Sequence, residues 1–207
     1  MITIIDYGAG NLRSVQKALE QLGYNATISS DRTEIKKSNG IILPGVGSFD
    51  ATINELRSKG LEGVIEEVIA LQKPFLGICL GYQLLFQSSE EGKEKGFGII
   101  EGKVKRFSFA NTSFQNYQVP HMGWNRLLIK HKNPLMENIL EGSMVYFAHS
   151  YYPVPDNPNV VATETDYGIN FVSSIAKGNL FGIQFHPEKS GEIGLKILKN
   201  FAQLTKQ

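Results

Sequence analysis

The sequence contains only one cysteine, and this scarcity excludes several kinds of protein. Cys79 has no partner for an internal disulfide and cannot build a multi-cysteine zinc site, so a reducing compartment is compatible with the chain. We expect no metal and no cofactor.

An excess of charge of one sign is also missing. Lysine and arginine number 21 and aspartate and glutamate 20, for a formal net charge of +1. Without a basic cluster the chain lacks the electrostatic footprint of a nucleic-acid-binding protein. No apolar run approaches the length of a membrane span. The N-terminal stretch MITIIDYG has no basic leader and reaches an acid at Asp6, so we do not interpret it as a signal peptide. We expect a cytoplasmic protein with no nucleic-acid or membrane partner.

Internal repeats, low-complexity tracts and linkers are absent too, and what is present is typical of one globular domain spanning residues 1–207. The first half alternates short apolar runs with amphipathic segments. The second half has short runs rich in β-branched and aromatic residues. The sequence therefore predicts an α/β fold, an open and mostly parallel sheet covered by helices, with added antiparallel strands in the second half. We expect strands at 2–5, 24–29, 40–45, 73–78, 103–107, 145–154, 159–164, 169–175 and 180–185. Helices are expected at 11–22, over about 49–71 with an interruption near Gly60 and Gly63, from 80 onward and at 192–204. Asn11 is a plausible cap for the first helix.

The single cysteine lies where an apolar strand is expected to turn into a helix. In the stretch FLGICLGYQLLF, Gly77 and Gly81 flank Cys79 at two residues on each side, which is the form of a nucleophile elbow. A helix N-terminus favours thiolate over thiol, and the N–H of Leu80 would point at an oxyanion formed on a substrate. The alternative interpretation is that Cys79 is a small hydrophobic core residue.

A thiolate nucleophile needs a base, and one of the four histidines stands out. His186 follows the apolar run LFGIQF and precedes Pro187 and Glu188. A proline keeps the residue before it extended, so we expect the side chains at 186 and 188 to project to the same side. A carboxylate there can orient an imidazole, as in a catalytic triad. Cys79 and His186 both follow expected central strands, and ligands bind at the carboxyl edge of a parallel sheet.

Three motifs, in this order along the chain, resemble those of a known family. PGVGSFD begins at Pro44, GICLGYQ at Gly77 and HPEKS at His186. Together they resemble the class I, triad-type glutamine amidotransferases, and the resemblance covers essentially the whole chain. DYGAGNLRSV near the N-terminus and PHMGWN at 120–125 narrow it to the glutaminase subunits of histidine biosynthesis. Position 82 departs from the pattern, because Tyr82 stands where the family commonly has methionine.

The resemblance implies hydrolysis of glutamine to glutamate and ammonia. Cys79 would attack the side-chain amide, His186 would act as base and then acid, and Glu188 would orient His186. The remaining residues implied for the site are the oxyanion residues of the PGVG loop and elbow, Gly45, Val46, Gly47 and Leu80, and the substrate-binding residues Gln83, Ser150 and Tyr151. From the residues alone, the preferred interpretation of PGVG is an ordinary turn at the end of a strand, and Ser150 and Tyr151 could be strand residues with polar caps.

The resemblance also implies a partner. The ammonia would pass to a separate (β/α)8-barrel cyclase, HisF, that converts the phosphorylated precursor PRFAR into imidazole glycerol phosphate and AICAR. The present chain is too short to contain that barrel, so a heterodimer is expected. The residues implied near the interface and the ammonia passage are His121, Met122, Trp124, Asn125, Tyr146 and Lys189. Trp124 could instead pack between layers of the fold.

Two other functions stay open from the sequence. A paralogous glutaminase could feed ammonia to another synthase, such as one that amidates surface sugars. A non-catalytic thiol sensor could reuse the fold, although a sensor has no need of the oriented acid–base residue that the HPE stretch provides.

Overall fold

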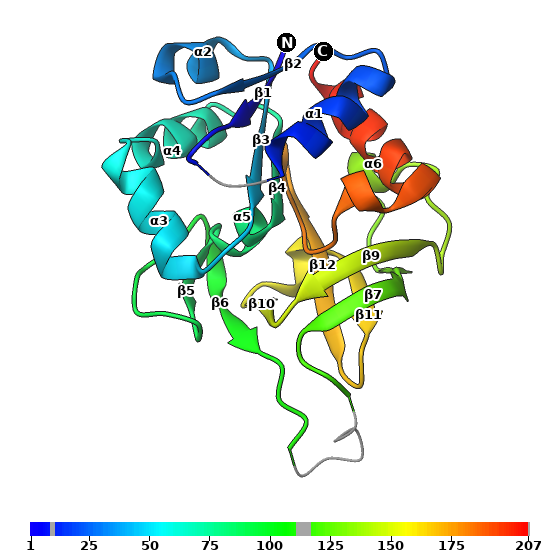
Figure 1. Ribbon diagram of the computed structural model, residues 1–207. Coiled ribbons are helices and arrows are strands. Elements are labelled where there is room, and N and C mark those ends of the chain that lie inside the picture. The colour runs from blue at the N-terminus through cyan, green and yellow to red at the C-terminus, as the bar shows by residue number, and fades with distance from the viewer. Residues whose placement is uncertain (9–10, 111–116, 207) are drawn as a thin grey trace.

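The centre of the molecule is an eight-stranded sheet (Figure 1). A computed structural model describes residues 1–8, 11–110 and 117–206; Ala9 and Gly10 of the DYGAG stretch lie outside the described residues. In spatial order the strands are β2 (Ala26–Ser29), β1 (Ile2–Ile5), β3 (Gly40–Gly45), β4 (Phe75–Cys79), β13 (Leu180–Ile183), β12 (Asn170–Lys177), β11 (Val161–Asp166) and β8 (Leu128–Ile129). The first five are parallel, and the last three are joined to them antiparallel. The predicted fold class is confirmed.

Helices cover both faces of this sheet because its central strands are apolar on both sides. Ile4 packs into the cluster shared with α1 (Leu12–Gln21) and α6 (Gly191–Leu204), whereas the next residue, Ile5, packs into the cluster on the opposite face. That opposite face is covered by three helices, α2 (Arg32–Lys37), α3 (Phe49–Ser58) and α4 (Glu62–Ala70). Successive side chains of a strand point to opposite faces, so a strand that is buried on both faces is apolar at every position. Such continuous apolar runs allowed these strands to be predicted from the sequence.

Besides the main sheet, the middle of the chain forms two small sheets. One joins β10 (Tyr151–Pro155), β6 (Ile100–Arg106) and β5 (Phe86–Ser89), and the other pairs β7 (His121–Arg126) with β9 (Met144–His149). The short helix α5 (Leu80–Gln83) connects β4 to β5, and the 3-10 helices η1 (Pro134–Met136), η2 (Pro158–Val160) and η3 (Pro187–Lys189) mark turns.

Two sequence predictions about these elements are wrong. The run 145–154 is not one strand, because the chain leaves the β7–β9 sheet at Ser150 and enters the β10–β6–β5 sheet. The helix expected from Leu80 onward ends at Gln83, and Phe86 already belongs to a strand. Both segments are apolar enough to be buried in either form, and short apolar runs do not distinguish a helix from a strand.

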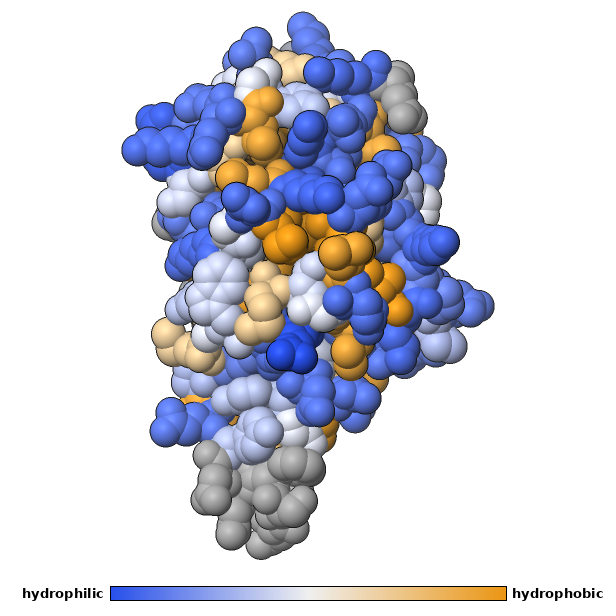
Figure 2. Space-filling view, turned by 90° about the vertical axis from the view of Figure 1, so that its right-hand side faces the viewer, coloured by the Kyte–Doolittle hydropathy of each residue, from blue (hydrophilic) through white to orange (hydrophobic). Residues whose placement is uncertain are grey.

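The side of the molecule that carries α6, β7 and β9 has hydrophobic surface gathered across its middle, between hydrophilic ends (Figure 2). Large exposed hydrophobic side chains in these and adjoining segments are Met122, Trp124, Leu140 and Met144. Within the described ranges, no helix has both the length and the apolar character needed to cross a membrane.

Candidate active site

Cys79 occupies a sharp turn between β4 and α5. Its φ is 55° and its ψ −110°, a backbone conformation that non-glycine residues rarely adopt and that costs about 1–3 kcal/mol. The glycines on either side allow the chain to pass closely: a Cβ on Gly77 would lie 2.7 Å from the carbonyl oxygen of Gly81, and a Cβ on Gly81 would lie 1.9 Å from that of Leu43. The turn points the thiol away from the sheet, in the manner of a nucleophile elbow.

The imidazole of His186 lies between the thiol and a carboxylate. It is hydrogen-bonded to the side chain of Cys79, and its Nδ1 lies 3.0 Å from Oε1 of Glu188. Burial disfavours the charged ring, but the hydrogen bonds to Cys79 and Glu188 outweigh it and raise the pKa of His186 to about 10. Near neutral pH this ring therefore carries a proton that it can give to a leaving group.

The histidine and the carboxylate meet through a turn and not through an extended strand. The residue before the proline is extended, as expected, since His186 has φ −98° and ψ 99°, but the next three residues form η3. Ser190 closes this turn: its hydroxyl donates to the carbonyl of His186 at 2.6 Å and accepts from the N–H of Tyr146 at 2.9 Å. The side chains of His186 and Glu188 come together as expected, but they do so through this turn and not along an extended strand.

These groups open onto a cavity of ≈ 310 Å³ at the carboxyl edge of the parallel strands. Cys79 is buried, with 8% of its surface exposed, and it lines this cavity. Nine of the residues singled out from the sequence line this cavity. They are Val46, Gly47, Cys79, Gln83, Met122, Ser150, Tyr151, His186 and Lys189.

The PGVG loop runs directly beside the elbow. Gly45 is the register partner of Cys79 in the β3–β4 pair, and a Cβ there would lie 2.5 Å from the N of Gly81. Gly47 has φ 107°, which glycine adopts without strain. Neither Gly45 nor Leu80 is among the residues that line the cavity. Any part they have in binding an oxyanion is played by the backbone N–H, because glycine has no side chain and that of leucine is apolar.

Gln83 lies in the cavity with its amide nitrogen already engaged. Its Nε2 donates to the carbonyl of Tyr151 at 3.1 Å and to Oε1 of Gln184 at 3.0 Å. An amide nitrogen has two protons, so both are used. A ligand can therefore reach Gln83 through its oxygen, which accepts a hydrogen bond.

Of the residues expected at an interface, two are strongly exposed and one is buried. Met122 is 64% exposed and Trp124 53%, whereas His121 is 3% exposed. Alternation along β7 explains this, because successive side chains point to opposite faces of a strand. Trp124 meets Tyr146 edge to face at 6.2 Å, and Nζ of Lys189 lies 5.9 Å from the Tyr146 ring centroid. His121 lies inside the fold, and its place near the interface or the ammonia passage stays a prediction; the alternative that Trp124 packs between layers is wrong, because its side chain is exposed.

Three further polar side chains belong to the site and were not singled out from the sequence. Asn11 does not cap α1 with its side chain; its Nδ2 donates to Oε1 of Glu188 at 2.6 Å, from a left-handed backbone with φ 72°. Glu91 lines the cavity and accepts from the N–H of Phe49 at 2.8 Å. Burial raises the pKa of its carboxyl group.

Gln184 is the third of these side chains, and its Nε2 lies 3.6 Å from Sγ of Cys79. A signal for it was available in the sequence. It precedes His186 by two residues, and in an extended chain such residues share a side.

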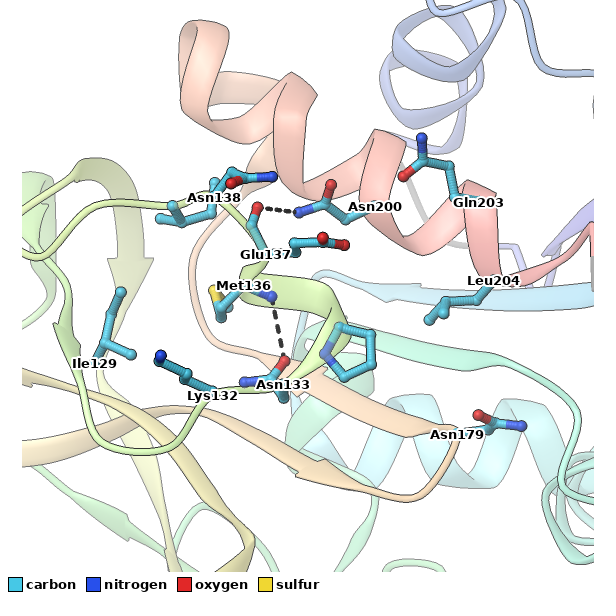
Figure 3. Close-up of a pocket in the computed structure, with 12 residues that line it drawn as sticks. Ile129, Lys132, Asn133, Met136, Glu137, Asn138, Asn179, Asn200, Gln203 and Leu204 are labelled. Carbon is cyan, nitrogen blue, oxygen red and sulfur yellow. Dashed lines mark hydrogen bonds between the residues drawn. The ribbon is translucent and has the colours of Figure 1, made fainter.

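A larger cavity, of ≈ 1100 Å³, lies elsewhere, between η1 and the C-terminal part of α6 (Figure 3). Its lining combines neutral amides such as Asn133, Asn138 and Gln203 with apolar side chains, and its charged groups are Lys132 and Glu137. No thiol, hydroxyl or imidazole side chain is among the residues that line it, so the chemistry points to the smaller cavity. No group of three or more potential metal ligands occurs among the described residues.

The fold and this site define a class of protein. The sequence profile of the family "Glutamine amidotransferase class-I" matches residues 3–204, and the chain belongs to that family. It is 51% identical over 205 residues to "Imidazole glycerol phosphate synthase subunit HisH" of Geobacillus sp. (strain WCH70), covering 99% of this chain and 97% of that protein. A protein of the same name from Moorella thermoacetica is 49% identical, with 99% and 95% covered.

Solved structures share the fold at low identity. The structure of PurLQS from Thermotoga maritima has a TM-score of 0.75 at 20% identity, with 98% of this chain and 97% of that chain covered. A crystal structure of a glutamine amidotransferase has a TM-score of 0.74 at 18% identity, with both chains fully covered.

Proposed function

We propose that this chain is the glutaminase subunit of an imidazole glycerol phosphate synthase. Two observations support the proposal. Curated relatives of that name are about half identical over nearly the whole chain, and a thiol, an imidazole and a carboxylate stand in hydrogen-bonded succession at a cavity. The second observation carries the chemistry, since it is the arrangement that amide hydrolysis through a thiol needs.

The reaction proceeds through a thioester on Cys79. The thiolate attacks the side-chain amide carbon of glutamine, and backbone N–H groups of the elbow and the PGVG loop stabilise the oxyanion. His186 gives its proton to the nitrogen, the carbon–nitrogen bond breaks and ammonia leaves. Water then attacks the thioester, His186 takes its proton, and glutamate is released with the free thiol. Glu188 holds the ring in the orientation for both transfers.

The cavity also has charges suited to the ends of an amino acid. Glu91 and Lys189 line it, and their opposite charges complement the α-ammonium and α-carboxylate of glutamine. The side-chain oxygen of Gln83 can accept a hydrogen bond from the α-ammonium group, because both N–H groups of Gln83 already donate within the protein. Ser150 and Tyr151 also line the cavity, and we propose that their backbone contributes to holding the amino-acid end of glutamine.

The ammonia passes to a (β/α)8-barrel cyclase partner, HisF, which converts PRFAR into imidazole glycerol phosphate and AICAR. Met122 and Trp124 offer exposed apolar surface beside the cavity for this docking, together with Tyr146 and Lys189. We propose further that residues 1–207 act as one domain in the cytoplasm, where a free thiol nucleophile stays reduced.

The test is ammonia release from glutamine, measured with and without the barrel cyclase. We expect release in the complex and its loss by at least about a thousandfold in Cys79→Ala, because the nucleophile is gone. Binding of the cyclase should persist in the variant, which controls for the fold. Retained hydrolysis in Cys79→Ala would refute the nucleophile assignment. Release stimulated only by a different synthase would favour the paralogous glutaminase, and no release under any condition would favour a thiol sensor.

A further inference from the structure

The side-chain amide of Gln184, a fully buried residue two positions before His186, also contacts the reacting sulfur. Gln184 has no exposed surface, and its Nε2 lies 3.6 Å from Sγ of Cys79. A buried amide is costly unless its hydrogen bonds are made, so its orientation is fixed by its partners.

Those partners determine which end of the amide faces the sulfur. The carbonyl oxygen of Tyr151 can only accept, so the atom of Gln83 that meets it at 3.1 Å is the nitrogen. The same nitrogen meets Gln184 at 3.0 Å, so it meets an oxygen there. The remaining end of the Gln184 amide is the NH2 group, and it is this group that is directed at Sγ.

A second series of hydrogen bonds holds Tyr151 from the other side. Nδ1 of His149 donates to the carbonyl of Tyr151 at 2.8 Å, which leaves Nε2 of His149 to accept from Nδ1 of His121 at 3.0 Å. Nε2 of His121 then accepts from Nδ2 of Asn125 at 3.3 Å. A continuous series of hydrogen bonds between neutral groups thus connects Asn125 on β7 to the nucleophile Cys79.

The titratable and charged groups around the sulfur are few. Tyr7, Glu91, His149, Tyr151, His186 and Lys189 face it or line the same cavity. His186 is the cationic donor that hydrogen-bonds the sulfur directly, and it must release its proton to the departing nitrogen during the reaction. The amide of Gln184 keeps its protons throughout, because an amide does not titrate near neutral pH.

We propose that Gln184 is a catalytic residue whose amide N–H stabilises the thiolate of Cys79, held in place by Gln83 and the Tyr151 carbonyl. The inference rests on the proposed function for its catalytic meaning. The hydrogen bond itself can be tested without glutamine.

The experiment measures alkylation of Cys79 by iodoacetamide across pH 5–9 on the intact chain. Gln184→Met keeps the volume and removes the donor, and we expect alkylation at neutral pH to slow about tenfold as the profile moves about one pH unit higher, since only the thiolate reacts. Gln184→Glu keeps the acceptor for Gln83 and adds a negative charge, so its profile should move further. Gln203→Met, an exposed glutamine on α6, is the matched control and should overlay the parent.

Profiles of both Gln184 variants that overlay the parent would overturn the proposal. If neither variant folds, side-chain amide NMR of the parent decides: a buried glutamine NH2 pair should shift with the midpoint of the alkylation profile and stay fixed in Cys79→Ala. No such pair would equally overturn it. A parent that never releases ammonia would refute the proposed function and leave the alkylation result standing, so the two failures are distinguishable.

Discussion

At the scale of single residues, Tyr82 has a polar atom without a partner in the core. The side chain is fully buried and its hydroxyl makes no hydrogen bond. The ring packs over Gly182, where a Cβ would lie 2.1 Å from Cδ2 of the ring, and it meets Phe86 edge to face. Burial raises the pKa of Tyr82 well above its ordinary value, so the phenol remains neutral.

Removing this hydroxyl should stabilise the protein. We expect Tyr82→Phe to raise the free energy of unfolding by about 1 kcal/mol, because the desolvation cost of an unpaired buried hydroxyl disappears while the packing of the ring is kept. Urea unfolding at pH 7 measures the change. Tyr24→Phe, with a half-buried ring, is the control and should differ from the parent by less than about 0.5 kcal/mol. A loss of stability in Tyr82→Phe would mean that its hydroxyl has a partner.

At the scale of elements, β7 separates two roles on its two faces. Met122 and Trp124 point outward, while His121 points inward and pairs with His149. One six-residue strand therefore carries exposed apolar surface on one face and, on the other, polar groups linked to the active site. The alternation of side chains makes this division unavoidable once the strand lies at the surface.

An aromatic anchor on the outer face should matter for docking. Trp124→Ala is expected to weaken binding of the barrel cyclase by at least about tenfold, since aromatic side chains dominate interface energetics. Isothermal titration calorimetry measures the affinity. The melting temperature should change little, because Trp124 is 53% exposed. Leu140→Ala, a 77% exposed residue outside β7, serves as the matched control; equal effects of the two substitutions would argue against an anchor at Trp124.

At the scale of the whole molecule, three buried histidines make the free energy of unfolding depend on pH, two of them in one direction and the third in the other. Burial lowers the pKa of His121 to about 4 and, together with smaller effects, that of His149 to about 3. The unfolded chain binds protons on these rings below about pH 6.5 and the folded chain does not, so acid destabilises the fold. His186, with a folded pKa of about 10, stabilises the fold below pH 6.5 and loses that contribution as pH rises toward 10.

Stability should therefore be greatest near pH 6.5 and decline on both sides. Each buried neutral ring contributes a slope of up to about 1.4 kcal/mol per pH unit on the acid side. Urea unfolding at pH 5, 6.5 and 8.5 measures the profile. His186→Gln should flatten the alkaline decline, while His131→Gln, at an exposed position, should leave the profile unchanged. A stability that rises steadily from pH 6.5 to 8.5 would contradict this balance.

Several elements of the fold and the turn at Cys79 could be predicted from short stretches of the sequence. The apolar runs 2–5 and 40–45 coincide with β1 and β3, and the helix expected at 192–204 corresponds to α6. The glycines around Cys79 prescribe the elbow, because only residues without a Cβ permit the close approach found there. These features depend on residues within a few positions of one another, so the local conformational preferences of those residues are enough to predict them.

What only the tertiary structure decided depends on contacts between distant positions. Asn11 meets Glu188 across 177 positions, and Gln184 meets Cys79 across 105. Whether 145–154 forms one strand or two, and whether the helix after Cys79 continues past Gln83, was settled by which sheet each segment could join. Local sequence patterns report burial and periodicity, but the partner that satisfies a buried polar group is chosen by packing of the whole chain.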